Sequence, residues 1–157
     1  MTLSEGGTEI APPEPTEFVL EVPSDPRVIE GVVAYLVGRL RRFAFDGSRL
    51  NLNFRVGVTE ALANAMIYGN ARDPRKRVRV EVEVDGSCVR LRVIDQGNGF
   101  DPLAVPDPTV GSNLHRTGGR GIFLIRNLMD EVEFNACGNE VRLVLHRSGG
   151  RRRAAGA

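Results

Sequence analysis

The chain has 157 residues, of which 41% are hydrophobic and 26% charged, and its formal net charge is +1. This size and composition are typical of one globular domain with a sizeable core. No stretch approaches the roughly 20 apolar residues of a membrane-spanning helix, and no basic segment followed by an apolar run marks a signal peptide. With a near-neutral charge and two cysteines, the sequence predicts a cytoplasmic protein that binds neither a membrane nor nucleic acid directly.

The two ends of the chain have the composition of disordered segments. Residues 1–16 are rich in Pro, Gly, Glu and Thr, and residues 148–157 read SGGRRRAAGA. Such sequences cannot bury enough apolar surface to offset the entropy lost on ordering. We therefore expect a disordered arm at 1–16, one folded domain at 17–147 and a disordered tail at 148–157. The arginines of the tail either stay solvated or contact an acidic partner.

The first half of the folded region predicts a strand followed by two long helices. The strand is expected at 17–22, and Ser24 is a residue type that caps the first turn of a helix. That helix should continue to about Phe43. A second helix is expected over about 49–68, ending at Gly69, a residue suited to a left-handed C-terminal cap.

The second half predicts two hairpins separated by a loop and a helix. Strict alternation in RVRVEVEV is typical of a half-buried strand, and the Asp85-Gly86 pair that follows is a strong turn signal. The expected elements are strands at 77–84, 88–95, 131–136 and 140–147, a loop at 101–117 and a helix at 121–131. This order favours an α+β two-layer sandwich, with an antiparallel or mixed sheet and helices on one face.

Two polar residues interrupt the small apolar residues of the second predicted helix. Residues 58–70 read VTEALANAMIYGN, in which Glu60 and Asn64 are four residues apart and share one helical face. An unpaired carboxylate is costly to place in a dry core. The face that carries both residues is therefore expected to line an open pocket, whereas the apolar residues pack inward.

A first glycine cluster follows the third predicted strand. The strand runs into VIDQGNGFDP, where Asp95 stands at the strand end and Gly97 and Gly99 let a ligand approach the backbone closely. The same composition is also typical of an ordinary turn.

A second glycine cluster opens the stretch TGGRGIFLIRNL at 117–128, and its glycines stand at the start of an apolar-periodic helix. The N-terminus of a helix attracts phosphate, and Arg120 adds a charge that can bind phosphate oxygens in pairs. A flexible hinge between loop and helix is the alternative. Together, the helical acid and amide, the strand-end acid and the glycines would supply the parts of one site.

The three stretches VTEALANAMIYGN, VIDQGNGFDP and GGRGIFLIRNLMDEV resemble the N-box and the two glycine boxes of the GHKL superfamily of ATPases. Within it, the sequence is most similar to the bacterial anti-sigma factor serine/threonine kinases of partner-switching systems. The similarity extends over about residues 17–147. It implies the histidine-kinase-like (Bergerat) ATPase fold, with ATP held beside the sheet under a mobile lid.

The resemblance also implies a role for each site residue. Asn64 would coordinate Mg²⁺ through its amide oxygen, Glu60 would act as general base, and Asp95 would accept a hydrogen bond from the adenine amino group. The remaining residues would contact the nucleotide through glycine backbone or arginine charge. They are Gly97 and Gly99 at the adenosine, Gly119, Arg120 and Gly121 at the phosphates, and Arg116 in a lid at 103–117.

In function, the resemblance implies an anti-sigma factor, expected to be a homodimer, that binds a sigma factor. It would use Mg-ATP to phosphorylate a serine or threonine of an anti-anti-sigma (STAS-type) protein. One alternative is an ATP-binding partner-switching module with little or no turnover, and another is a plain ATP hydrolase domain. The presence of Glu60 favours the kinase, because a module without turnover could dispense with a general base.

Overall fold

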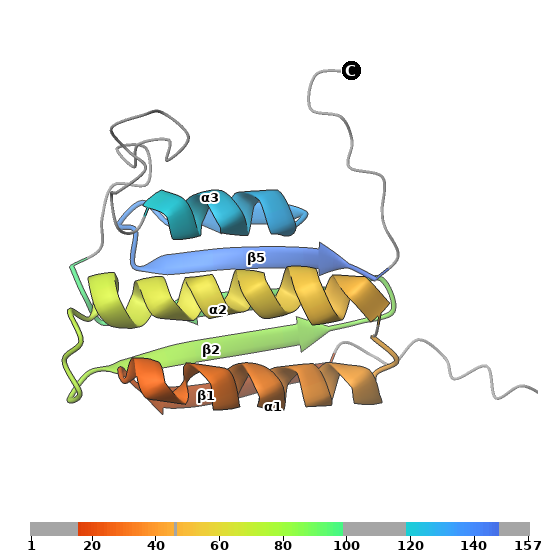
Figure 1. Cartoon of the computed structure of the whole chain (residues 1–157), viewed down its shortest axis with the longest axis horizontal. Helices are drawn as coiled ribbons and strands as arrows, with labels where there is room; N and C mark the ends of the chain where they lie inside the picture. Colours follow the sequence, from red (N-terminus) through yellow and green to blue (C-terminus); the bar gives the residue numbers. More distant parts are fainter. Residues whose placement is uncertain (1–15, 46, 99–118, 148–157) are drawn as a thin grey trace, which may run out of the picture.

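The computed structural model describes residues 16–45, 47–98 and 119–147. Within these residues, one five-stranded sheet is covered on one face by helices, as Figure 1 shows. The predicted α+β two-layer sandwich is therefore confirmed. The expected arm, apart from Thr16, and the expected tail and lid lie outside the described residues.

Every pairing in the sheet of the described chain is antiparallel, and the strand order is β1-β2-β3-β5-β4. The strands are β1 (Thr16–Pro23), β2 (Arg77–Val84), β3 (Cys88–Ile94), β4 (Glu131–Phe134) and β5 (Glu140–His146). The alternation of β2 places its valines against the helices and its charged residues on the outer face. Period-two alternation thus decides which sheet face the helices cover.

The helices lie side by side across the inner face (Figure 1). They are η1 (Pro26–Val28) and α1 (Ile29–Arg42), then the continuous run η2 (Arg49–Phe54), α2 (Arg55–Ala63) and η3 (Asn64–Gly69), and finally α3 (Gly119–Leu128). The predicted second helix is confirmed, but η2 and η3 are π-helical. Such π turns are frequent at functional sites, and Asn64 opens the second one. Among the described residues, no helix has the length and apolar content needed to cross a membrane.

The core forms where these helices meet the sheet. Large side chains from both layers are at most 1% exposed; they include Leu36, Leu40, Phe54, Leu62, Met66, Leu91 and Leu143. Burying side chains of this size contributes about 1.5–3 kcal/mol each relative to exposure. The second helix is therefore anchored along its length, which fixes the position of its polar face.

The start of the first helix differs from the prediction. Ser24 is not the cap: the carboxylate of Asp25 accepts the Arg27 N–H at 3.0 Å. Ser24 is instead buried, and its Oγ accepts a hydrogen bond from Asn70 Nδ2 at 2.6 Å. The prediction was wrong because both Ser24 and Asp25 are suitable caps, and the distant Asn70 engages the serine.

The end of the second helix also differs. Gly69 does not adopt a left-handed conformation, which is taken by Ala71 (φ 51°) and Arg72 (φ 59°) instead. The Arg72 N–H closes the helix by bonding the Met66 carbonyl at 2.8 Å. Glycine at position 69 therefore has another cause, which lies in the site.

The third helix ends earlier than predicted, at Leu128 rather than at 131. The Asp130 N–H bonds the Val144 carbonyl at 2.9 Å, and the Asp130 carboxylate accepts the His146 N–H at 2.7 Å. Pairing with β5, a contact that is remote in sequence, therefore ends the helix.

Candidate functional site

Glu60 and Asn64 lie beside the first turn of α3. A Cβ atom built on Gly121 would lie 2.8 Å from Glu60 Oε2 and 3.4 Å from Asn64 Oδ1. Gly121 is buried at this contact. Because any side chain at position 121 would displace the Glu60 carboxylate, glycine permits the close approach of the two helices. The structure thus brings the first and third of the predicted stretches together.

Both polar side chains have hydrogen-bonding capacity that the described residues do not use. Asn64 Nδ2 is buried and has no partner there. The Glu60 carboxylate likewise forms no hydrogen bond or ion pair within the described chain. A buried amide without a partner costs about 1–3 kcal/mol. Among the described residues, the only other buried side-chain atom without a partner is Arg92 Nε, on the outer face of the sheet. An orphan beside the helix contact, such as Asn64 Nδ2, is typical of a side chain that binds a ligand.

Asp95 lies at the other side of the site, directly after β3. Its side chain is buried, and Oδ1 accepts the Gly97 N–H at 2.8 Å. Burial raises the pKa of the Asp95 carboxyl above its ordinary value, whereas the Gly97 N–H and the charge of Lys76 offset part of that rise. A buried carboxylate with so few donors is well suited to accept a hydrogen bond from a ligand.

Two glycines surround Asp95 because there is no space for a side chain. A Cβ atom on Gly69 would lie 2.2 Å from Asp95 Oδ2, and one on Gly97 would lie 1.7 Å from the Gly69 carbonyl oxygen. Both distances are far below contact. Gly97 is therefore required by the close approach of the helix end to the loop after β3, whereas a side chain at Gly69 would have to displace the Asp95 carboxylate.

A small cavity of about 20 Å³ connects the two sides of the site. Asn64 lines it from the second helix, Asp95 from the end of β3, and Ile125 from α3. The β4–β5 hairpin completes the wall at Asn139, whose carbonyl accepts the Asp95 N–H at 2.9 Å. The proposed metal ligand and the proposed adenine acceptor therefore face the same space.

Some predicted site residues are not described. Gly119 is the first residue of α3, and Arg120 is described only by its backbone in that helix. Gly99 and Arg116 lie outside the described residues. Their predicted contacts with adenosine and phosphate remain predictions.

Sequence reasoning missed Asn70. This residue is fully buried, and its Oδ1 accepts the Gln96 N–H at 2.7 Å in the loop that carries Asp95. The only signal was its place directly after Gly69 in the first stretch. An asparagine at a helix end is ordinarily read as a cap.

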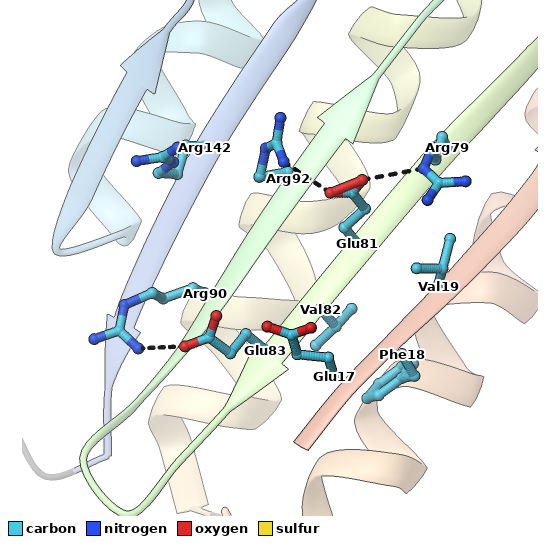
Figure 2. A pocket seen from close by; sticks show the side chains of 10 residues that line it. All are labelled: Glu17, Phe18, Val19, Arg79, Glu81, Val82, Glu83, Arg90, Arg92 and Arg142. Atoms are coloured by element: carbon cyan, nitrogen blue, oxygen red, sulfur yellow. Dashed lines mark hydrogen bonds and ion pairs between the residues drawn. The ribbon is translucent and has the colours of Figure 1, made fainter. Parts of the chain in front are cut away.

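A larger hollow lies elsewhere, on the outer face of the sheet (Figure 2). It measures about 460 Å³ and is lined mainly by Glu and Arg. Several of these charges form ion pairs: Glu81 bonds Arg92 at 2.8 Å and Arg79 at 3.0 Å, as Figure 2 shows. Cross-strand ion pairs are typical of a solvated antiparallel face. This hollow is therefore a charged surface and not the predicted site.

Known proteins resemble this chain in both sequence and fold. The family model of the histidine kinase-like ATPase domain matches residues 22–145, a range that includes Glu60, Asn64, Asp95 and Gly121. The anti-sigma F factor of Anoxybacillus flavithermus is 35% identical over 95 residues, which cover 57% of this chain and 64% of that protein. The serine-protein kinase RsbW of Listeria innocua is 26% identical over 124 residues, which cover 74% of this chain and 78% of that protein.

A solved structure shares the architecture. The crystal structure of the RsbU and RsbW domains of a Mycobacterium tuberculosis protein matches with a TM-score of 0.58 at 18% identity. The match covers 84% of this chain and 32% of the other. At this identity, the likeness shows the fold alone.

Proposed function

The chain belongs to the histidine kinase-like ATPase domain family, and on that premise we propose that it binds Mg-ATP and transfers the γ-phosphate to a protein serine or threonine. The observation that carries the proposal is the convergence of Glu60 and Asn64 on the first turn of α3 at Gly121. The names of the relatives, anti-sigma F factor and serine-protein kinase RsbW, supply the setting. The protein would bind a sigma factor and phosphorylate an anti-anti-sigma protein.

The residues present fit a magnesium–nucleotide complex. Asn64 lines the cavity, and its amide oxygen forms no hydrogen bond within the described residues. Mg²⁺ takes oxygen ligands and is often held by few protein groups together with phosphates and water. When bound, Mg²⁺ would neutralise phosphate charge. Asp95 would accept a hydrogen bond from the adenine amino group at the glycine-walled end of the site.

Glu60 would carry the proton transfer. Its carboxylate would accept the proton of the attacking hydroxyl while that oxygen bonds to the γ-phosphorus and the bond to the bridging oxygen breaks, releasing ADP. Phosphoryl transfer otherwise requires mainly positioning and charge stabilisation. The peptide N–H groups at the start of α3, with Arg120, would supply both.

The test is phosphate transfer with ATP labelled at the γ position, using a purified anti-anti-sigma protein as acceptor, with ATP binding measured in parallel. Labelling of the acceptor supports the kinase. ATP binding without transfer to any such acceptor would favour the partner-switching module, and absence of ATP binding would overturn the nucleotide site itself.

We also propose that the protein is a homodimer. Light scattering on the same sample tests this oligomeric state.

A further inference from the structure

Three polar residues of the described chain are buried as a whole, and hydrogen bonds join their segments at one end of the fold. Ser24 is 2% exposed, Asn70 0% and Asp95 7%. A buried polar group destabilises the fold unless it is hydrogen-bonded, so polar residues gathered in one place need a common cause.

Asn70 connects segments that are far apart in sequence. Its Nδ2 donates to Ser24 Oγ at 2.6 Å, at the end of β1, and to the Arg77 carbonyl at 3.0 Å, at the start of β2. Its Oδ1 accepts the Gln96 N–H at 2.7 Å. One side chain thus ties the second helix to two strands and to the loop that leaves β3.

That loop carries the proposed adenine acceptor. Gln96 lies between Asp95 and Gly97, and the Gly97 N–H donates to Asp95 Oδ1. The loop also contacts the Gly69 backbone, and the Gln96 side chain accepts the Arg77 N–H at 2.6 Å. The bond from the Gln96 N–H to Asn70 is the tie between the backbone of the loop and the Asn70 side chain.

We propose that Asn70 is a positioning residue for nucleotide recognition: it holds the loop so that the Asp95 carboxylate faces the base. This inference rests on the proposed function. Adenine presents an amino donor where guanine presents a carbonyl oxygen. The position of Asp95 should therefore decide the preference for ATP over GTP, and Asn70 should control that preference without touching the nucleotide.

The variants separate positioning from general stability. Asn70→Ala removes all three side-chain bonds, whereas Ser24→Ala removes only one bond and leaves Gln96 held. Asn53→Ala is the matched control, because Asn53 Nδ2 donates to the Leu128 carbonyl at 2.8 Å, outside the site.

Two readouts are measured for each folded variant. The first is the ratio of the GTP and ATP dissociation constants, which should fall by about tenfold in Asn70→Ala and by less in Ser24→Ala. The second is amide hydrogen exchange without nucleotide, which should become about tenfold faster at Gln96 and Gly97 in Asn70→Ala. Asn53→Ala should change neither.

An unchanged ratio with unchanged exchange at Gln96 and Gly97 would overturn the proposal. Equal weakening of ATP and GTP, as in a merely destabilised protein, would also overturn it. If Asn70→Ala does not fold, Asn70→Ser, which also removes the amide oxygen that accepts the Gln96 N–H, decides by the same two measurements. If the wild type binds neither nucleotide, the proposed function fails, whereas the exchange measurement still decides whether Asn70 positions the loop.

Discussion

Two aspartates stand at opposite ends of β3, and their surroundings are opposite. Asp85, in the turn before the strand, accepts bonds from the Ser87 N–H at 2.7 Å, the Cys88 N–H at 3.0 Å and the Arg90 guanidinium at 2.8 Å. Asp95, after the strand, accepts one bond from the Gly97 N–H within the described residues. The Ser87 N–H, with the other donors, holds the pKa of Asp85 well below its ordinary value, whereas burial raises the pKa of Asp95.

Asp85 therefore stabilises the fold, whereas the Asp95 carboxylate is available to a ligand. Asp85 stands one position and Asp95 two positions before a glycine, so both have the local sequence of a turn. The number of donors and the degree of burial separate them. The acceptors of Asp85 are occupied by donors of its own turn and by Arg90, whereas Asp95 is buried and can accept further hydrogen bonds.

The largest effect is expected at Glu60, a partly buried carboxylate that forms no hydrogen bond or ion pair within the described residues. Glu60→Gln should reduce phosphate transfer by about 10²–10⁴-fold, since the variant cannot accept the hydroxyl proton. ATP affinity should change little. Glu30→Gln, at an exposed acid of α1, is the matched control. Transfer that persists in Glu60→Gln at the wild-type rate would remove Glu60 from the reaction.

The next test removes the negative charge of Asp95 and keeps the size of its side chain. Asp95→Asn should weaken ATP binding by about tenfold or more, because a charged acceptor is lost, as measured by calorimetry. Its stability at neutral pH should equal or exceed that of the wild type. A carboxyl whose pKa is raised on folding destabilises the protein as pH rises through its ordinary value of 3.8 to the raised value, and the amide removes this effect. A large fall in melting temperature would make Asp95 a structural residue like Asp85.

A smaller effect is expected from Gly69→Ala. The new methyl group would displace the Asp95 carboxylate, which is the movable end of a side chain, so the fold should survive while ATP affinity falls several-fold. Gly38→Ala is the matched control: it lies within α1 with nothing within 4 Å of its Cβ position. It should stabilise the protein by about 1 kcal/mol. Equal ATP affinity in the two variants would show that the contact of Gly69 with Asp95 does not matter for binding.

The smallest effect is expected from Asp85→Asn, which should leave ATP binding unchanged and cost about 1–2 kcal/mol of unfolding free energy at pH 7. The pKa of Asp85 is lowered on folding, so its contribution is present above the ordinary value of 3.8 and is lost as pH falls through the lowered value. Denaturant unfolding of both proteins should therefore show the stability difference shrinking below about pH 4. A stability difference that does not change with pH would mean that the charge of Asp85 does not contribute to stability.

The fold was predictable because its signals are local. The alternation of β2 and the periodicity of the helices give element type and buried face without knowledge of any partner. The predicted end of the third helix was wrong because a remote contact decides it: the Asp130 N–H bonds the Val144 carbonyl of β5. The roles of the site residues came from resemblance to a family, since spacing alone could show only that Glu60 and Asn64 share a face.

What the sequence could not reveal is why particular small and polar residues stand at the end of the second helix. Gly69 as a left-handed cap and Gly69 as a contact for Asp95 look identical in sequence, because the decisive neighbour is 26 residues away. The same holds for Asn70, whose partners lie in three other segments. Such contacts become visible only when the segments are brought together.

The contact between the Gly97 position and the Gly69 carbonyl has a thermodynamic consequence. Two backbone segments that already touch have little freedom left to lose when a base arrives, so this wall of the site is preorganised. Recognition at this end should then carry a small conformational-entropy cost. Substitutions that loosen the contact should weaken binding through entropy, even where every group that touches the base is kept.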